Sequence, residues 1–223
     1  MTKVVTVKRR VLAANEERAE TLRARFAASG TLVANLISSP GSGKTTLLEA
    51  TVQALDGELT TAVIEGDVAT ENDADRIRAL GVPAHQILTG GACHLDARQV
   101  EVGIEDGGLP EVDILFIENV GNLICPTTYD LGEDFKVVLL SVAEGDDKPV
   151  KYPAIFARAE VAVITKSDLL PYVPFDLDSV KSQIASLNPN GRVLVTSSLK
   201  DDGVDRWIDL LRTRLEAKRQ SLG

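Results

Sequence analysis

The stretch from Ser38 to Thr46 constrains the fold of this chain more than any other part of its sequence. It reads Ser-Ser-Pro-Gly-Ser-Gly-Lys-Thr-Thr, with an apolar run at 32–37 before it and a helix-like run at 47–55 after it. A strand, a glycine-rich turn, a Lys-Thr pair and a helix form the arrangement that cradles nucleotide phosphates. Backbone N–H groups close around the phosphate oxygens, and the helix adds its free N-terminal amides. The sequence therefore predicts a P-loop.

Individual roles within this loop follow from the same chemistry. Lys44 would reach the β- and γ-phosphates as a catalytic group, and the Thr45 hydroxyl would ligate Mg²⁺. The general pattern has Gly five residues before Gly43, where this chain has Ser38. A chance glycine-rich turn is the alternative, and the matching flanks argue against it. The residues predicted to bind the nucleotide phosphates are Gly41, Ser42, Gly43, Lys44, Thr45 and Thr46.

Composition restricts the classes of protein that remain. The chain has 223 residues, enough for one large domain or two small ones with a buried core. Its formal net charge of −9 makes it a poor candidate for binding nucleic acid or an anionic membrane, because both need basic surfaces. No apolar run approaches the roughly 20 residues of a spanning helix, and no signal-peptide core follows the basic residues 1–10. We expect a cytoplasmic protein, whose two cysteines are free thiols.

Apolar runs that favour strands alternate with amphipathic runs that favour helices along the whole chain. Several strand candidates are continuous runs of Val, Ile and Leu, which is typical of strands buried on both faces of a parallel sheet. This order predicts a single α/β P-loop NTPase domain over 1–223, with a mostly parallel, doubly wound sheet and helices on both faces. The basic segment and helix at 1–30 are expected to pack onto it. The expected strands are 32–38, 60–65, 86–89, 113–118, 136–142, 161–165 and 192–196, and the expected helices 15–28, 44–55, 71–80, 95–105, 149–158, 178–187 and 204–218.

Acidic residues at two further strand ends complete the predicted magnesium and phosphate site. Ligands of doubly wound sheets bind at the carboxyl ends of strands, where Glu-Gly-Asp at 65–67 and Glu-Asn-Val-Gly at 118–121 both fall. Asp67 is predicted to hold Mg²⁺ or its water, or to orient the attacking water, which makes it the second catalytic candidate. Glu118 would contact Mg²⁺ directly or through a water, and Gly121 can offer its N–H to the γ-phosphate. Capping of a loop is the alternative for the two acids at 65–67.

The identity of the base is indicated by Thr-Lys-Ser-Asp at 165–168, which follows an apolar strand. A carboxylate at Asp168 would accept from the two N–H donors on the Watson–Crick edge of guanine, and the Lys166 stem would pack on the ring. Adenine lacks that pair of donors, so a buried unpaired carboxylate penalises ATP. The loop containing Ser198 would close over the base. The sequence therefore predicts GTP and GDP as ligands.

A second kind of chemistry is indicated by Cys93 and His94, which are neighbours, and by Cys125, which lies just beyond the loop at 118–121. Thiolate and imidazole are ligands for Zn²⁺, Ni²⁺ and Cu. Adjacent residues chelate together only in a loop, and three ligands fall short of four, so a second chain on a two-fold axis is the natural completion. A buried cysteine and a capping histidine are the alternative. Across such a dimer Lys148 could reach the partner's nucleotide, and a solvated basic loop is the simpler interpretation.

These segments resemble the hydrogenase nickel-incorporation GTPases of the HypB type, which belong to the P-loop metallochaperone group. The most specific matches are Gly-Ala-Cys-His-Leu at 91–95 and Glu-Asn-Val-Gly-Asn-Leu-Ile-Cys-Pro at 118–126. The resemblance extends over most of the chain and also includes the segments 38–45, 65–67 and 144–153. That family also has Ser at the position of Ser38.

The resemblance implies a function that spacing alone does not. The family binds and hydrolyses GTP with Mg²⁺, forms GTP-dependent homodimers and helps to insert Ni²⁺ into NiFe-hydrogenase. Its metal site maps onto Cys93, His94 and Cys125, where Zn²⁺ is a competitor for Ni²⁺. The implied partners are a HypA-type nickel chaperone and the hydrogenase large-subunit precursor. Residues 1–37 contain neither Cys nor His, so the N-terminal nickel-storage clusters of some members are not expected.

Three functions remain open at this point. The first is a slow GTPase whose cycle drives nickel delivery to hydrogenase, slow because no catalytic Gln or Arg is evident near the switch residues. The second is the same machine for urease, whose factor typically has Cys-Pro-His where this chain has contiguous Cys93 and His94. The third is a metal-buffering module with a vestigial nucleotide site. The third is opposed by the presence of all four nucleotide-site residues, Lys44, Thr45, Asp67 and Asp168.

Overall fold

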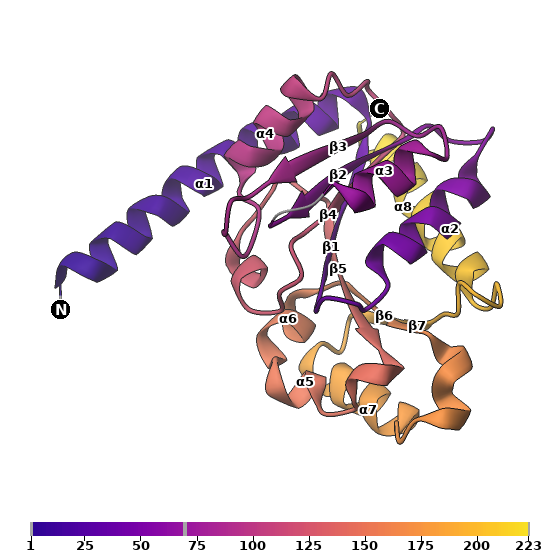
Figure 1. The fold of residues 1–223 in the computed structure, drawn as a ribbon. Helices are drawn as coiled ribbons and strands as arrows, with labels where there is room; N and C mark the ends of the chain where they lie inside the picture. Colours follow the sequence, from indigo (N-terminus) through magenta and orange to yellow (C-terminus); the bar gives the residue numbers. More distant parts are fainter. Residues whose placement is uncertain (1, 69–70, 223) are drawn as a thin grey trace.

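A single parallel sheet organises the chain, shown as a ribbon in Figure 1. The structure is a computed structural model and describes residues 2–68 and 71–222. Seven strands pair in the order β3-β2-β4-β1-β5-β6-β7, and every pair is parallel. This confirms the predicted doubly wound α/β fold. The strands are β1 Leu32–Ser38, β2 Thr61–Asp67, β3 Ala84–Leu88, β4 Ile114–Glu118, β5 Phe135–Ser141, β6 Val161–Thr165 and β7 Arg192–Val195.

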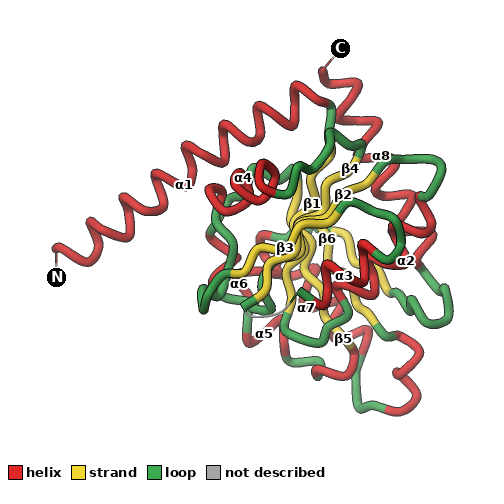
Figure 2. The backbone as a smooth tube through the Cα atoms, turned by 45° about the horizontal axis from the view of Figure 1, so that its top comes forward, coloured by secondary structure: helices red, strands yellow, loops and turns green. Residues whose placement is uncertain are grey.

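Helices cover both faces of this sheet, as the tube view in Figure 2 shows. One apolar core joins α2, α3 and α8 to one face, and two further cores join α1 and α4, and α6 and α7, to the other. The strands have apolar side chains on both faces because both are covered. The helices are α1 Thr2–Ser29, α2 Lys44–Leu55, α3 Asn72–Arg78, α4 Ala97–Asp106, α5 Lys148–Lys151, α6 Pro153–Arg158, α7 Leu177–Leu187 and α8 Val204–Leu222, with short 3₁₀ turns η1 Cys125–Thr128, η2 Val142–Glu144 and η3 Ser167–Tyr172.

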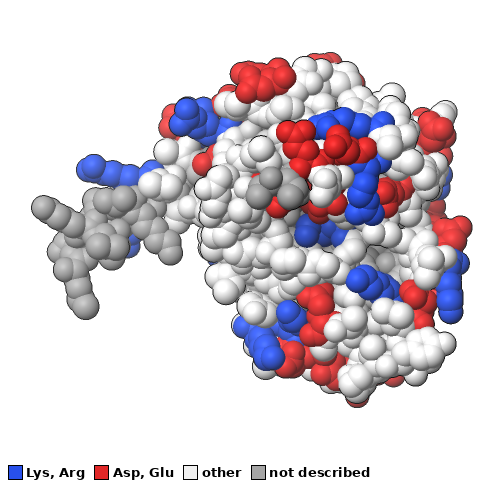
Figure 3. Space-filling model, viewed as in Figure 1, with Lys and Arg blue, Asp and Glu red and all other residues white. Residues whose placement is uncertain are grey.

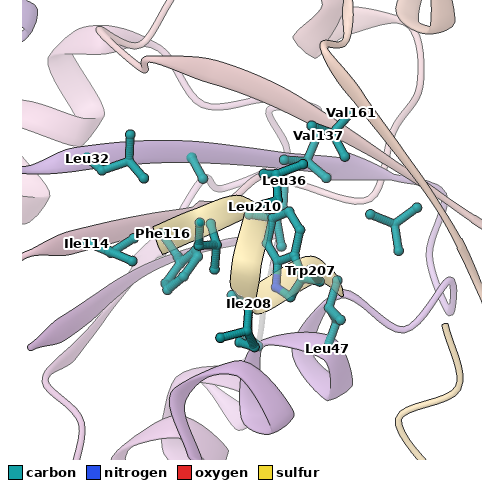
Figure 4. Packing of buried hydrophobic residues seen from close by; sticks show 14 of the residues in the cluster. Leu32, Leu36, Leu47, Ile114, Phe116, Val137, Val161, Trp207, Ile208 and Leu210 are labelled. Carbon is teal, nitrogen blue, oxygen red and sulfur yellow. The ribbon is translucent and has the colours of Figure 1, made fainter. Parts of the chain in front are cut away.

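Helix α8 anchors the core beneath the P-loop. Its Trp207 is fully buried and lies close to Leu47 of α2 and Leu36 of β1 (Figure 4). The indole N–H donates to the Thr51 hydroxyl at 2.9 Å, which satisfies the polar atom that burial of a tryptophan would otherwise leave unpaired. Helix α2, which begins at Lys44, is therefore fixed from behind by α8.

Two helices differ from the prediction. The helix expected at 149–158 is wrong, because the chain breaks at Tyr152 (φ −125°, ψ 52°) between α5 and α6. Pro153 has no N–H to donate and disfavours the helical conformation of the residue before it. Helix α1 begins at Thr2 rather than residue 15, and its first half extends away from the sheet (Figure 1). It ends at Ser29 and is followed by Gly30, whose φ of +68° is a conformation in which glycine is favoured.

Among the helices of residues 2–68 and 71–222, none is both long enough and apolar enough to cross a bilayer.

We expect Trp207→Ala to lower the free energy of unfolding by about 3–5 kcal/mol, because it opens a cavity in the core and removes the hydrogen bond that the indole N–H donates to the Thr51 hydroxyl. Urea unfolding followed by circular dichroism measures the change without depending on tryptophan fluorescence. Leu199→Ala, at a position that is 84% exposed, is the control and should change stability by less than about 0.5 kcal/mol. Equal effects of the two substitutions would contradict this account of the core.

Candidate functional site

The loops that carry the predicted nucleotide residues meet at one edge of the sheet. Parallel strands all point their carboxyl ends the same way, so the loops after β1, β2, β4 and β6 converge there. They enclose an open cavity of about 400 Å³. The residues that line it include Gly41, Lys44, Asp67, Asn119, Gly121 and Lys166.

The P-loop has the backbone geometry that phosphate binding needs. Gly41 (φ +76°) and Gly43 (φ +89°) adopt left-handed conformations that turn the chain into α2. The Lys44 ammonium lies 2.9 Å from the Ser38 hydroxyl and 3.8 Å from a carboxylate oxygen of Glu118. Ser38, which departs from the general pattern, therefore supplies a hydrogen-bond acceptor to the P-loop lysine.

The segment predicted to bind the base crosses over the P-loop. The Thr165 hydroxyl donates to the Ser42 carbonyl at 2.6 Å, and the Lys166 ammonium donates to the Gly41 carbonyl at 2.8 Å. Asp168 lies outside the residues that line the cavity, and its Oδ1 accepts from the Ser197 hydroxyl at 2.6 Å. Ser198, the next residue, is half-buried. The loop at 196–198 thus fixes the orientation of the carboxylate predicted to contact guanine.

Two carboxyl groups face each other beneath the P-loop. Glu65 of β2 and Glu118 of β4 are register partners, and both are buried. Burial raises the pKa of Glu65 well above its usual range, and the neighbouring Glu118 raises it further. Burial also raises the pKa of Glu118, while Lys44 opposes that rise. The Thr45 hydroxyl donates to Glu118 Oε1 at 3.1 Å.

This carboxyl pair supplies the observation that bears on magnesium. Among the described residues, Oε1 of Glu65 and Oε2 of Glu118 are buried without a hydrogen-bond partner. Asp67, at the end of β2, lines the cavity beside Thr45. Carboxylate and hydroxyl oxygens are the donors that Mg²⁺ prefers. The residues present therefore fit a magnesium site at this position.

The loop after β4 lies directly against the P-loop. A Cβ added at Gly121 would stand 2.8 Å from Cγ of Pro40, a separation that real Cβ atoms do not show. Glycine is therefore required at position 121 for the two loops to approach. The structure places the predicted switch residue beside the predicted phosphate site.

Basic and acidic side chains alternate around the mouth of the cavity. Arg76 of α3 lines the cavity and forms ion pairs with Glu49 at 2.7 Å and Asp73 at 3.2 Å. Figure 3 shows the charges of both signs in this part of the surface. Arg76 was not predicted as a site residue, because its position in the sequence gives no sign that α3 lies beside the P-loop.

A network around Glu144 was also not predicted. Its Oε2 accepts from the Ser42 hydroxyl at 2.5 Å and from the Ser141 backbone N–H at 2.9 Å. Lys148 lies 3.5 Å from Glu144 and donates to the Ser39 hydroxyl at 3.3 Å, so its ammonium contacts the P-loop of its own chain. The spacing of Ser141 and Glu144 is that of a capping box, which is the signal that could have located this turn.

The predicted metal ligands come together within one chain. Ligand atoms of Cys93, His94 and Cys125 all lie within 4.8 Å of one another, and Cys93 Sγ is 3.6 Å from His94 Nδ1. Cys93 and His94 lie in an irregular loop after β3, while Cys125 begins the η1 turn after β4. The loop that chelation by adjacent residues requires is therefore present. A second chain is not needed to assemble these three ligands.

The surroundings of this group set its protonation. The adjacent Cys93 thiol and burial both raise the pKa of Cys125 above its ordinary value. Burial lowers the pKa of His94, and Asp96 opposes that change. The His94 ring also packs against the Tyr129 ring, with centroids 3.9 Å apart and the two planes tilted by 41°. A neutral imidazole and thiols that must lose protons are the ligands that an incoming soft metal ion would meet.

The comparisons with known proteins point to one family. Residues 32–195 match the family described as the CobW/HypB/UreG nucleotide-binding domain. The chain is 50% identical over 204 residues to the hydrogenase maturation factor HypB of Escherichia coli K12, covering 92% of this chain and 70% of that protein. It is 41% identical over 223 residues to the hydrogenase/urease maturation factor HypB of Helicobacter pylori, covering 98% and 90%.

A solved structure gives the same result for the fold. The crystal structure of HypB from Helicobacter pylori in complex with nickel superposes with a TM-score of 0.85 at 41% identity, covering 94% of this chain and 97% of that one. More distant neighbours, such as a signal recognition particle receptor at 14% identity and a TM-score of 0.53, share the fold alone.

The affinity of the three-ligand group for a soft metal ion is expected to rise with pH. The raised pKa of Cys125 keeps its thiol protonated at neutral pH, and metal binding must release that proton. Titration with Co²⁺ between pH 6 and 9, followed by thiolate-to-cobalt charge-transfer absorption, should show affinity increasing by up to about tenfold per pH unit for each proton released.

Cys125→Ser is the control for this titration, because a hydroxyl does not ionise in the same range. It should weaken binding and reduce the pH dependence. A native protein whose Co²⁺ affinity stays constant over this range would contradict the assignment of Cys125 as a ligand.

Proposed function

This chain belongs to the CobW/HypB/UreG family of nucleotide-binding domains, and on that basis we propose that it is a GTP-hydrolysing nickel metallochaperone of hydrogenase maturation. The printed names of its relatives support the hydrogenase assignment, and the nickel complex of the Helicobacter protein supports the cargo. The whole chain, 1–223, would act as one domain, and its site of action would be the cytoplasm.

The single observation that carries the proposal is the position of the metal group beside the nucleotide cavity. Strand β4 ends at Glu118, its loop passes Gly121 against the P-loop, and the same loop continues to Cys125. The other two ligands lie in the loop after β3, at the same edge of the sheet. One loop therefore faces both sites, so a change at the phosphate can alter the geometry of a metal ligand.

The hydrolytic step would use the residues of the cavity. Lys44 and the P-loop amides would bind the phosphates, and the Gly121 N–H would contact the γ-phosphate. Thr45 and Asp67 would hold Mg²⁺, which would neutralise charge at the β- and γ-phosphates when bound. Glu118 would support this magnesium site from beneath. Asp67 would also orient the attacking water. Among the described residues that line the cavity none is Gln, and the one Arg, Arg76, is held by ion pairs to Glu49 and Asp73, so we expect turnover to be slow.

Guanine would be selected by the carboxylate of Asp168, held in place by Ser197. Lys166 would pack along the base with its stem while its ammonium contacts the Gly41 carbonyl. The backbone around Ser198 would close the base site. Because the carboxylate loses its partners with adenine, ATP is disfavoured.

The metal group would carry Ni²⁺ as cargo, with Zn²⁺ competing for the same thiolate and imidazole ligands. We propose that GTP binding brings two copies together and that a HypA-type nickel chaperone and the hydrogenase large-subunit precursor are the protein partners. A two-fold axis near Cys93, His94 and Cys125 would add ligands from the second copy. Neither nucleic acid nor membrane is a proposed partner.

Urease maturation is a second candidate, and a specific observation favours it. The Helicobacter pylori relative is named for both hydrogenase and urease. The contiguous pair Cys93-His94 supports the hydrogenase assignment. Nickel transfer from the loaded protein to each apoenzyme precursor would separate the two. Failure to hydrolyse GTP would instead favour a metal-buffering module.

Guanine selection gives the first test. Asp168→Asn should weaken GDP binding by about 10- to 100-fold and leave ADP binding unchanged, because a hydrogen bond to a charged partner contributes about 1.5–3 kcal/mol. Competition against a fluorescent guanine nucleotide measures both affinities. Asp178→Asn removes an exposed carboxylate on α7 and is the matched control. If Asp168→Asn binds GDP as tightly as the native protein does, Asp168 does not recognise guanine.

Dimer formation gives the second test. Light scattering with Mg²⁺, Ni²⁺ and a non-hydrolysable GTP analogue should report a dimer for the native protein. Cys93→Ala should lose the contribution that Ni²⁺ makes to dimer stability while keeping its nucleotide affinity. A monomer under every combination of metal and nucleotide would refute a metal site shared by two copies.

A further inference from the structure

Asn119 lies between the nucleotide cavity and the metal group and touches the backbone of both. It follows Glu118 at the end of β4 and is only 1% exposed. Its Oδ1 accepts from the Val120 backbone N–H at 3.0 Å and from the Leu95 backbone N–H at 3.1 Å. One oxygen atom therefore serves the loop that faces the phosphate and the loop that carries Cys93 and His94.

Leu95 is held at a second point as well. It directly follows His94, and its side chain is fully buried over Gly66 of β2. A Cβ added at Gly66 would stand 2.8 Å from Leu95 Cγ, so the contact requires glycine there. Leu95, the residue after the histidine ligand, is thus held both at the end of β2 and at the end of β4.

The same asparagine reaches the segment that follows Cys125. Its Nδ2 donates to Asn35 Oδ1 at 3.3 Å, and Asn35 Nδ2 donates to Glu133 Oε1 at 3.2 Å. Glu133 Oε2 then accepts from the Leu131 backbone N–H at 2.6 Å, two residues beyond Tyr129, whose ring packs against His94. These buried polar groups form a continuous chain of hydrogen bonds between two ligand segments, the loop that carries Cys93 and His94 and the segment that follows Cys125.

A second buried asparagine offers a comparison. Asn15 of α1 accepts from the Ala97 backbone N–H at 2.9 Å and donates to the Asp130 carbonyl at 2.8 Å. It therefore also joins the two ligand segments and is only 7% exposed. Neither of these two partners belongs to the loops that line the nucleotide cavity.

We propose that Asn119 is the positioning residue through which the nucleotide state changes the affinity of the metal group. Movement of Val120 and Gly121 towards a γ-phosphate alters the hydrogen bond that Val120 donates to Asn119 Oδ1. Since Leu95 shares that oxygen, the loop of Cys93 and His94 shifts with it. This inference rests on the proposed function and adds a route to the histidine-bearing loop that does not pass through Cys125.

The test compares nickel affinity in two nucleotide states of the full chain. The dissociation constant for Ni²⁺ is measured with Mg²⁺-GDP and with Mg²⁺ and a non-hydrolysable GTP analogue, and their ratio reports the coupling between the sites. For the native protein we expect a ratio of about fivefold or more. Asn119→Ala should bring it to within about twofold of unity when each nucleotide is supplied at a concentration that saturates the variant.

Asn15→Ala is the matched control, since it removes two hydrogen bonds to the same two segments from another direction. It should weaken Ni²⁺ binding by a similar factor in both nucleotide states and preserve the native ratio. The proposal is overturned if Asn119→Ala keeps the ratio of Ni²⁺ dissociation constants that the native protein shows. It is also overturned if both variants lose this ratio equally, because that result would show a general loosening of the loops.

A measurement on the native protein covers the case in which Asn119→Ala does not fold. Hydrogen exchange of individual amides by NMR should show that protection of the Leu95 N–H differs between the GDP and GTP-analogue states. The Ala97 N–H, which bonds to Asn15, should exchange at the same rate in both. Unchanged protection at Leu95 would reject the route through Asn119.

These outcomes separate this inference from the proposed function. If the native protein binds neither Ni²⁺ nor guanine nucleotide, the proposed function fails and the inference fails with it. If the native protein binds and hydrolyses GTP, binds Ni²⁺ and shows a ratio above unity that Asn119→Ala leaves unchanged, only the route through Asn119 is refuted.

Discussion

The parallel pairing of β1, β2 and β4 is the constraint on which the rest of this structure depends. The register sets Leu36 beside Glu118 and Glu118 beside Glu65, so β1 and β2 both end a short way beyond the end of β4, at Ser38 and Asp67. Parallel pairing sends every following loop to that edge. The P-loop, the two acidic strand ends and the metal-ligand loops are neighbours for this reason, although the chain separates the first ligand from the P-loop by about fifty residues. The register thus places the two kinds of chemistry side by side.

The negative net charge of this chain opposes the binding of an anion, so a site for phosphates needs positive side chains gathered locally. With a net charge of −9, the protein concentrates Lys44, Lys166 and Arg76 around one cavity and partners each of them. Lys44 bonds to Ser38, Lys166 to a P-loop carbonyl, and Arg76 to acidic residues of α2 and α3. The buried carboxyl pair beneath them has raised pKa values because burial disfavours two adjacent negative charges. Positive groups at the cavity and buried carboxyls below it therefore belong to one electrostatic arrangement.

Local sequence patterns could predict the strands and the P-loop because burial and glycine geometry act over a few residues. The same patterns merged α5 and α6, where the steric effect of Pro153 outweighs a periodic apolar run. The three metal ligands were predicted as residues, and their meeting within one chain depends on the β3 and β4 loops. The contacts of Asn119 with Leu95 and of Glu144 with Ser42 join residues 24 and 102 positions apart. Such bonds have no local signal, since only the folded sheet brings their partners together.

The surface position of the three-ligand group has a kinetic consequence. Structural sites for ions of this kind enclose the metal with four protein ligands, whereas open sites keep a coordination position for an incoming group. Cys93, His94 and Cys125 lie at the ends of two surface loops and offer three ligand atoms. A donor atom from another molecule can therefore enter the coordination sphere before any of these ligands leaves. An ion held in this way can pass between two proteins by ligand exchange, without a free aquated intermediate.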